Sequence, residues 1–453
     1  MKSRLGKVPL GKLIAGCGAA VLVAVLGVVA VQAEEVSSCW ADFDSFTDKK
    51  VFPDAYTVRL IDTYDDPALR AAQRDPAYQA ATSFTGDEAI GGPVWTIATP
   101  GPNPVLTDEL GLLTARGGAD PGDLAMYEGR NGKRHWMRTA DAPADYFMKN
   151  LRALTFVPQS DGSTNVIGAD ARSGYLQWCQ SVPLSPAKSQ AGNASGWVTG
   201  TTGNGRTVLL VGAPKGAGPG TSAIAYQDVV TGKVTRQWNV QGIWTDVSSD
   251  GKLVYAAGPG AVAAYRPGVA EPVWQAKLPG DPGEVSFAAA EDGRVVVGSR
   301  PESGGPGTLT ALDTTGKTLW TIAATEPEDA LLTGDFVVVH ENRAGADGVA
   351  AYRIADATPV WFTPVPGLKR LADGGTNGTL LYLPGESGPR VLRVTDGVAQ
   401  PTTLTAPADR VFVSGQRVIV QHTVSPELAW TIAYLTPEAQ ADTGSAPEDP
   451  RQR

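Results

Sequence analysis

Three carboxylates are the side chains that the sequence places best for chemistry. Asp246, Glu284 and Asp329 fall on or beside short apolar runs that we expect to be innermost strands of a repeated fold. Two acids that converge to roughly 5–10 Å are what glycoside hydrolysis requires. Solvated loop carboxylates are the more common case, and one sequence does not show convergence. We therefore assign no catalytic residue from the sequence.

The histidines do not form a recognisable metal motif. His135, His340 and His422 lie in separate segments, and none has a second ligand two to four residues away, as zinc motifs do. The chain also lacks a Gly-x-Ser-x-Gly elbow and a phosphate-binding loop in a strand–turn–helix context. The formal net charge of −9 argues against a nucleic-acid partner. We expect no metal, no cofactor and no nucleic acid.

The N-terminus has the pattern of a membrane signal-anchor. Residues 1–12 carry four basic side chains, residues 13–33 carry no charge, and Glu34 and Glu35 follow. Such a run is long enough to cross a ~30 Å hydrocarbon core, with its basic flank in the cytoplasm. We therefore expect a single-pass protein of the cell membrane with residues after 33 outside the cytoplasm. Cleavage near Ala33 and secretion remain the alternative, and a lipid on Cys17 is the weaker one.

Two cysteines remain in the exported part, Cys39 and Cys179. In an oxidising compartment two thiols more often form a bridge than stay free. We predict a Cys39–Cys179 disulfide; two unrelated cysteines are the alternative.

The tryptophans indicate the fold. Most follow a β-rich run and a glycine turn, at spacings of 41, 42, 60, 36, 46 and 41 residues: Trp95, Trp136, Trp178, Trp238, Trp274, Trp320 and Trp361. A turn series with glycine before each last strand keeps the same period: Gly132, Gly174, Gly232, Gly268, Gly316 and Gly397. A period near 40 with several short strands predicts an all-β propeller of four-stranded blades. We expect eight blades, with seven possible, and a packing role for these tryptophans.

The same parsing divides the chain into regions. We expect an extracytoplasmic, partly helical region at 34–92, the propeller at 93–437 and a disordered tail at 438–453. The run 93–100 is a lone outer strand, and the last unit supplies only three strands. Pairing them would close the ring and hide the open edges. Trp197 and Trp244 lie outside the tryptophan series and are the better candidates for contact with a partner, although core packing is the more common role for such side chains.

Two of the repeats resemble a known family. The phrases Asp170–Trp178 and Ala311–Trp320 are similar to the repeat of pyrroloquinoline-quinone-type propellers. The resemblance implies a fold shared by quinone-dependent alcohol and sugar dehydrogenases. The family also contains a non-enzymatic eight-bladed lipoprotein that assists outer-membrane protein assembly, which this chain resembles most in style. The dehydrogenases commonly hold their cofactor with a vicinal cysteine pair, which this chain lacks. The resemblance therefore does not transfer the redox activity.

The sequence favours a binding function. We expect a membrane-anchored extracytoplasmic scaffold that recognises a protein or an envelope polymer through one face of the ring and performs no catalysis. The alternatives are a quinone-dependent dehydrogenase, a carbohydrate-active propeller enzyme and a sensor of a small ligand.

Overall fold

The computed structural model of this protein describes most of residues 67–439. Within that range, short segments are not described: 100–104, 108–110, 116–121, 129–131, 133, 141–144, 150–151, 172–173, 175, 187–206, 280–281, 292–293, 302–304 and 426–427. The predicted membrane segment at 13–33, Cys39, Trp197 and the tail at 438–453, apart from its first two residues, lie outside the described residues. No helix among the described residues is long and apolar enough to span a bilayer.

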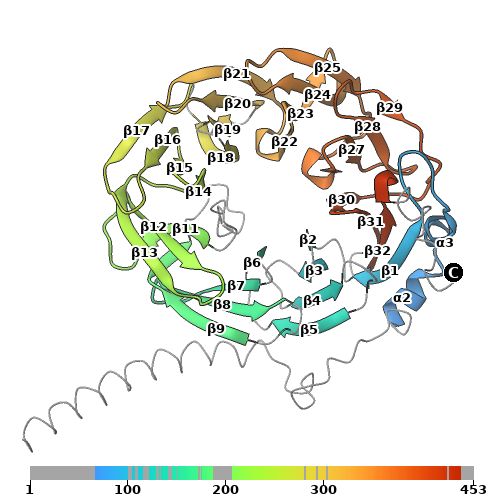
Figure 1. The fold of residues 1–453 in the computed structure, drawn as a ribbon, viewed down its shortest axis with the longest axis horizontal. Helices are drawn as coiled ribbons and strands as arrows, with labels where there is room; N and C mark the ends of the chain where they lie inside the picture. Colours follow the sequence, from blue (N-terminus) through green and yellow to red (C-terminus); the bar gives the residue numbers. More distant parts are fainter. Residues whose placement is uncertain are drawn as a thin grey trace, which may run out of the picture.

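The described strands form eight four-stranded antiparallel sheets that stand in a ring (Figure 1). In seven of these sheets the first strand lies nearest the centre of the ring and the last lies on its circumference (Figure 1). The two middle strands are buried over nearly continuous runs, as in β11 (Thr207–Pro214), β15 (Val254–Gly258) and β16 (Ala261–Tyr265), because a strand packed on both faces is apolar on both. The all-β propeller architecture predicted from the tryptophan period is therefore what the chain adopts.

Seven sheets are continuous in sequence, and in each of them the strands follow chain order from the inner to the outer one. The first four are β2 (Val105–Thr107), β3 (Gly111–Ala115), β4 (Gly122–Glu128) and β5 (Arg134–Ala140); β6 (Asp145–Lys149), β7 (Arg152–Pro158), β8 (Thr164–Asp170) and β9 (Leu176–Val182); β10 (Leu184–Pro186), β11 (Thr207–Pro214), β12 (Thr221–Asp228) and β13 (Val234–Gln241); and β14 (Asp246–Ser249), β15 (Val254–Gly258), β16 (Ala261–Tyr265) and β17 (Pro272–Lys277). The next three are β18 (Pro282–Glu291), β19 (Arg294–Pro301), β20 (Gly307–Leu312) and β21 (Thr318–Ala324); β22 (Leu331–Thr333), β23 (Phe336–Arg343), β24 (Ala346–Arg353) and β25 (Pro359–Pro364); and β26 (Gly375–Thr376), β27 (Leu380–Leu383), β28 (Arg390–Arg393) and β29 (Ala399–Gln400). Two 3-10 turns, η2 (Pro327–Asp329) and η3 (Leu371–Asp373), precede β22 and β26.

The remaining sheet closes the ring with strands from both ends of the chain. β1 (Pro93–Thr99) pairs antiparallel with β32 (Leu428–Leu435), which continues through β31 (Arg417–Ser425) to β30 (Arg410–Ser414). The predicted pairing of the lone strand at 93–100 with three C-terminal strands is confirmed. We call this the closing sheet.

A short helical segment, residues 67–92, packs against the closing sheet, and we call it the strap. It contains α2 (Pro67–Ala72) and α3 (Pro76–Ser83), which Figure 1 shows beside β1. Asp75 caps α3 by accepting a hydrogen bond from the amide of Ala77 at 2.9 Å. The buried strap side chains share one apolar cluster with residues of β30, β31 and β32: Ala72, Tyr78, Ala81, Ala89 and Ile90.

The periodic tryptophans lie on the outer strands and reach the next sheet along the ring. Trp274 of β17 contacts the turn between β20 and β21, where a Cβ added at Gly316 would lie 2.6 Å from the indole. The same relation joins Trp95 to Gly132, Trp136 to Gly174, Trp178 to Gly232 and Trp361 to Gly397, and all five glycines have positive φ. The predicted glycine turns thus pack against the indoles of the neighbouring sheets.

Hydrogen bonds fix several of these indoles. Each donor is the indole Nε1, and each acceptor is a carbonyl three residues before the turn position: Trp136 to Ala171 (2.8 Å), Trp178 to Val229 (3.1 Å), Trp320 to Ile354 (3.0 Å) and Trp361 to Val394 (2.8 Å). Two repeats depart from the contact between an indole and a glycine. At the turn that Trp320 contacts, the residue is Ala357, with φ +56°. At the turn that follows Trp238, Gly268 lies against the side chain of Arg236 and not against an indole.

Cys179 of β9 is disulfide-bonded. Because its predicted partner, Cys39, lies outside the described residues, the pairing stays a prediction. A bridge between these positions would close a loop of about 140 residues, for which chain entropy gives about 4–5 kcal/mol. We therefore expect Cys179→Ser to lower the melting temperature clearly, and non-reducing peptide mapping of the wild type to recover a Cys39–Cys179 peptide. Two separately alkylated cysteines would contradict the pairing.

Candidate functional site

The three candidate carboxylates do not form an acid pair in the contacts of the described residues. Asp246 begins β14 and Asp329 ends η2, and each is committed to partners of its own. Glu284 lies in β18, and its side chain is not described. The expectation that these residues sit on or beside inner strands holds, but no described contact brings two of them together.

Asp246 joins two neighbouring inner strands. Its carboxylate accepts hydrogen bonds from the amide of Val247 at 2.6 Å and from the amide of Phe287 in β18 at 2.7 Å. Burial raises the pKa of Asp246 to about 7, although both amide donors lower it. This side chain therefore acts as a bond between sheets and not as an open catalytic acid.

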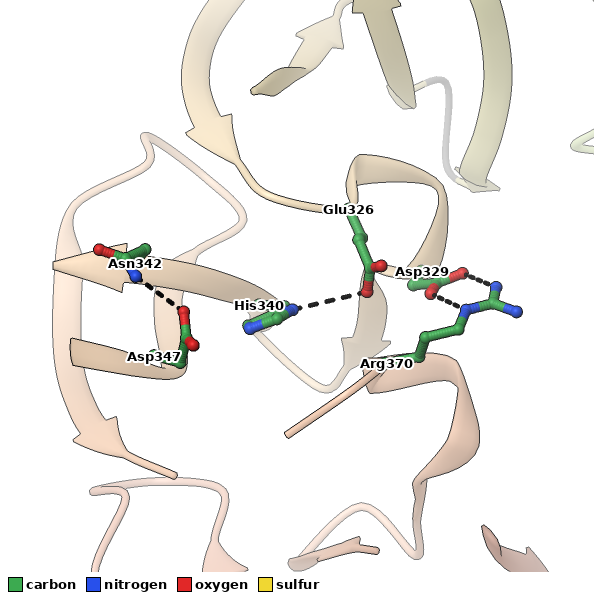
Figure 2. Close-up of polar contacts among 6 residues, drawn as sticks. All are labelled: Glu326, Asp329, His340, Asn342, Asp347 and Arg370. Atoms are coloured by element: carbon green, nitrogen blue, oxygen red, sulfur yellow. Dashed lines mark hydrogen bonds and ion pairs between the residues drawn. The ribbon is translucent and has the colours of Figure 1, made fainter. Parts of the chain in front are cut away.

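A row of ion pairs runs along the connections that enter the inner strands of three successive sheets, and we call it the charged row. Asp329 of η2 binds Arg370 through two hydrogen bonds, Nε to Oδ2 at 2.9 Å and a terminal nitrogen to Oδ1 at 2.8 Å (Figure 2). Asp373 of η3 lies 3.2 Å from Nε of Arg410, at the start of β30. Each pair thus links the connection before one sheet to the beginning of the next.

Glu326 and His340 extend the charged row at one end. Figure 2 shows Oε2 of Glu326 facing Nδ1 of His340, at 3.5 Å. His340 projects from β23 and is buried, and its Nε2 has no hydrogen-bond partner among the described residues. Further along β23 and β24, Asn342 donates to Asp347 at 2.7 Å. His340 is therefore a packed histidine held by one carboxylate.

The electrostatics of the row follow from partial burial. Burial, and then the negative charge of Asp329, raise the pKa of Glu326. Burial also raises the pKa of Asp373, against the opposing charges of Arg410 and Arg370. The hydrogen bonds to Asp329 raise the pKa of Arg370, so this guanidinium stays charged. Asp329 is only 5% exposed whereas Arg370 is 52% exposed. The buried acid therefore holds an arginine whose outer edge faces solvent.

This arrangement suits recognition better than reaction. A planar guanidinium fixed by a buried carboxylate loses little freedom when it binds, which is the property of arginines that dominate interfaces. No group of three or more His, Cys, Asp or Glu side chains suited to a metal occurs within the described ranges. The three histidines lie on β5, β23 and β31, in three different sheets.

Of the two tryptophans considered for contact with a partner, Trp244 is described, and it is buried. Trp244 lies in the connection before β14 with 2% of its surface exposed, and its Nε1 donates to the carbonyl of Gln241. Trp244 therefore has the core-packing role, because the chain folds the indole inward, against Tyr265, before the strand begins.

The Asp329–Arg370 pair gives a direct test of the charged row. We expect Arg370→Ala to cost about 1–3 kcal/mol of unfolding free energy, because it leaves Asp329 buried without its countercharge. The value is below the roughly 3–5 kcal/mol typical of fully buried pairs because Arg370 is half exposed. The control is Arg393→Ala, which breaks an exposed pair with Asp396 and should cost less than about 1 kcal/mol. If guanidinium denaturation showed the same loss of unfolding free energy for Arg370→Ala and Arg393→Ala, the buried carboxylate of Asp329 would not depend on Arg370.

Sequence reasoning found Asp329 but not Arg370, Asp373 or Arg410. The pair Asp329–Arg370 spans 41 residues, the same distance as two of the tryptophan intervals, because it joins equivalent connections of two repeats. The sequence therefore contains a signal, a separation of one repeat between an acid and an arginine. That separation does not distinguish an ion pair from two solvated side chains.

Comparison with known proteins identifies the family. The family model described as outer membrane protein assembly factor BamB matches residues 81–267 and 258–431. Among solved structures, BamB from Moraxella catarrhalis is 17% identical, with 75% of this chain and 96% of that chain covered and a TM-score of 0.49. The Dos1 propeller is 11% identical, with 78% and 93% covered and a TM-score of 0.48. No curated protein matches the sequence. The two stretches matched by the family model span well over half of this chain. The chain therefore belongs to the BamB family of pyrroloquinoline-quinone-like β-propellers.

Proposed function

We propose that this protein is a membrane-anchored, extracytoplasmic scaffold that binds another protein through its propeller and performs no catalysis. Residues 13–33 serve as the anchor, the eight sheets are the complete set of blades, and the Cys39–Cys179 bridge ties the membrane-proximal segment to the ring. The observation that carries the proposal is the family match, which extends over residues 81–431 and therefore over nearly the whole ring.

The charged row supports a binding role for the face that carries it. Its acids are paired with Arg370, Arg410 or His340, so none is poised as a free base or nucleophile. Arg370 offers unused N–H donors at a fixed position. A protein surface with backbone carbonyls or polar side chains is the ligand that such a group recognises, because the nearby acids discourage an anion.

The test is recovery of a partner from the native membrane. Tagged full-length protein is isolated in a gentle detergent, and associated proteins are identified by mass spectrometry. We expect one partner near equimolar amount, and we expect to lose it when residues 93–437 are replaced by an unrelated folded domain. Arg370→Ala should reduce its recovery, whereas the control Arg393→Ala should not. Absence of any partner above background would contradict the proposal.

A further inference from the structure

The strap is joined to the ring at the place where the ring closes. The hydroxyl of Tyr434 in β32 donates to the carbonyl of Ala81, and that of Tyr382 in β27 donates to the carbonyl of Ala89, at 3.1 and 3.3 Å. The amide of Gly91 donates to the carbonyl of Leu435 at 2.9 Å. The strap therefore bridges the closing sheet and the sheet before it.

Asp87 is a second attachment point of the strap. One carboxylate oxygen accepts from the amides of Ala89 and Ile90, both at 2.9 Å, and shapes the turn that leads into β1. The other accepts from the amide of Thr403 at 2.6 Å, in the connection between β29 and β30. Apolar packing and these neutral donors hold the C-terminal half of the strap at any pH at which Asp87 is charged.

The N-terminal half is held differently, by a histidine between two carboxylates. His422 of β31 has Nδ1 at 3.2 Å from Oδ2 of Asp409 and Nε2 at 3.9 Å from Oδ2 of Asp75, the cap of α3. Its ring lies against Trp430, with centroids 5.0 Å apart. The contact with Asp409 lacks hydrogen-bond alignment, so it is an electrostatic contact. Asp409 instead accepts from the amide of Thr423 at 2.7 Å.

We propose that His422 is an acid-sensitive latch that fastens the strap to the closing sheet when its imidazole is protonated. Histidine is the side chain whose charge ordinarily changes between about pH 5 and 8. With a neutral ring, Asp75 and Asp409 face each other across an uncharged group and repel. With a protonated ring, a cation stands between them and attracts both.

The other groups around His422 do not reverse this sign. The described contacts place Asp75 on its α3 side, Asp409 on the side of the connection before β30, and the uncharged Trp430 ring on the β32 side. Arg410, which follows Asp409 and pairs with Gln421 in the sheet, is engaged by Asp373. Acidification therefore tightens the strap, and alkaline conditions loosen its N-terminal half first.

Hydrogen exchange of the full-length protein tests the latch. The quantity is the protection of amides in residues 67–83, divided by that of β11 and β12 in the same sample, after correction for intrinsic exchange. We expect this ratio to rise about three- to tenfold between pH 8 and pH 5.5, the factor that one favourable charge contact gives. A ratio that does not change with pH in the wild type would overturn the latch.

Three variants assign the effect to the proposed groups. Asp75→Asn keeps an oxygen to cap Ala77, and Asp409→Asn keeps an oxygen for Thr423, so both remove charge and retain the backbone bonds. Each should reduce the pH response, and His422→Gln should abolish it, while His340→Gln in β23 leaves it intact. An unchanged response in Asp75→Asn and Asp409→Asn overturns the latch, even if His422→Gln fails to fold.

Discussion

Alanine in place of Gly316 is expected to lower the unfolding free energy by about 2–4 kcal/mol. The turn residue has φ +81°, a conformation that costs an L-residue about 1–2 kcal/mol. Its new Cβ would lie 2.6 Å from the indole of Trp274, and crowding of this kind typically costs a further ~1–3 kcal/mol. The measurement is the guanidinium midpoint and slope of the purified protein, compared with the wild type.

Gly251→Ala separates the two causes. Gly251 has φ +86° but nothing within 4 Å of the added Cβ, so only the backbone cost of about 1–2 kcal/mol should appear. Ala357→Gly, at the equivalent turn below Trp320, relieves a positive φ and should stabilise by up to about 1 kcal/mol. If Gly316→Ala cost no more than Gly251→Ala, the contact between the indole and the next sheet would not be a packing constraint.

The sequence predicted the repeat because the same contact recurs in most of the sheets. An indole must reach the turn of the next sheet, and that turn must have positive φ and no side chain under the ring. Both requirements are visible as residue types, tryptophan and glycine, at a fixed spacing. The pairing of residues 93–100 with the C-terminal strands was predictable for a related reason, since an unpaired strand and an incomplete sheet each leave an edge open.

The charged row could not be predicted in the same way. Asp329 and Arg370 lie 41 residues apart, and Asp246 and Phe287 are separated by the same 41 residues. Repeat spacing therefore shows which connections are neighbours. Whether a side chain there is buried depends on a few turns of irregular backbone, such as η2, which no periodic pattern encodes. Trp244 shows this dependence, since the connection before β14 turns its indole into the core.

Asparagine in place of Asp246 is expected to remove a pH dependence of stability worth about 4 kcal/mol. The folded protein raises the pKa of Asp246 from its ordinary 3.8 to about 7 because the carboxyl is buried. The folded state therefore holds this proton over a range in which the unfolded chain has released it. The stabilisation is complete below pH 3.8 and is lost as the pH rises to about 7, at about 1.36 kcal/mol per pH unit.

The readout is the difference in guanidinium midpoint between wild type and Asp246→Asn from about pH 4.5 to pH 8, which should change steadily up to about pH 7 and then level off. Asp313→Asn is the control. Hydrogen bonds from Thr315 lower the pKa of Asp313, so its titration lies below this range and its difference from wild type should stay constant. Parallel profiles for wild type and Asp246→Asn would mean that Asp246 is charged throughout. The amides of Val247 and Phe287 would then suffice to hold a buried carboxylate between two inner strands.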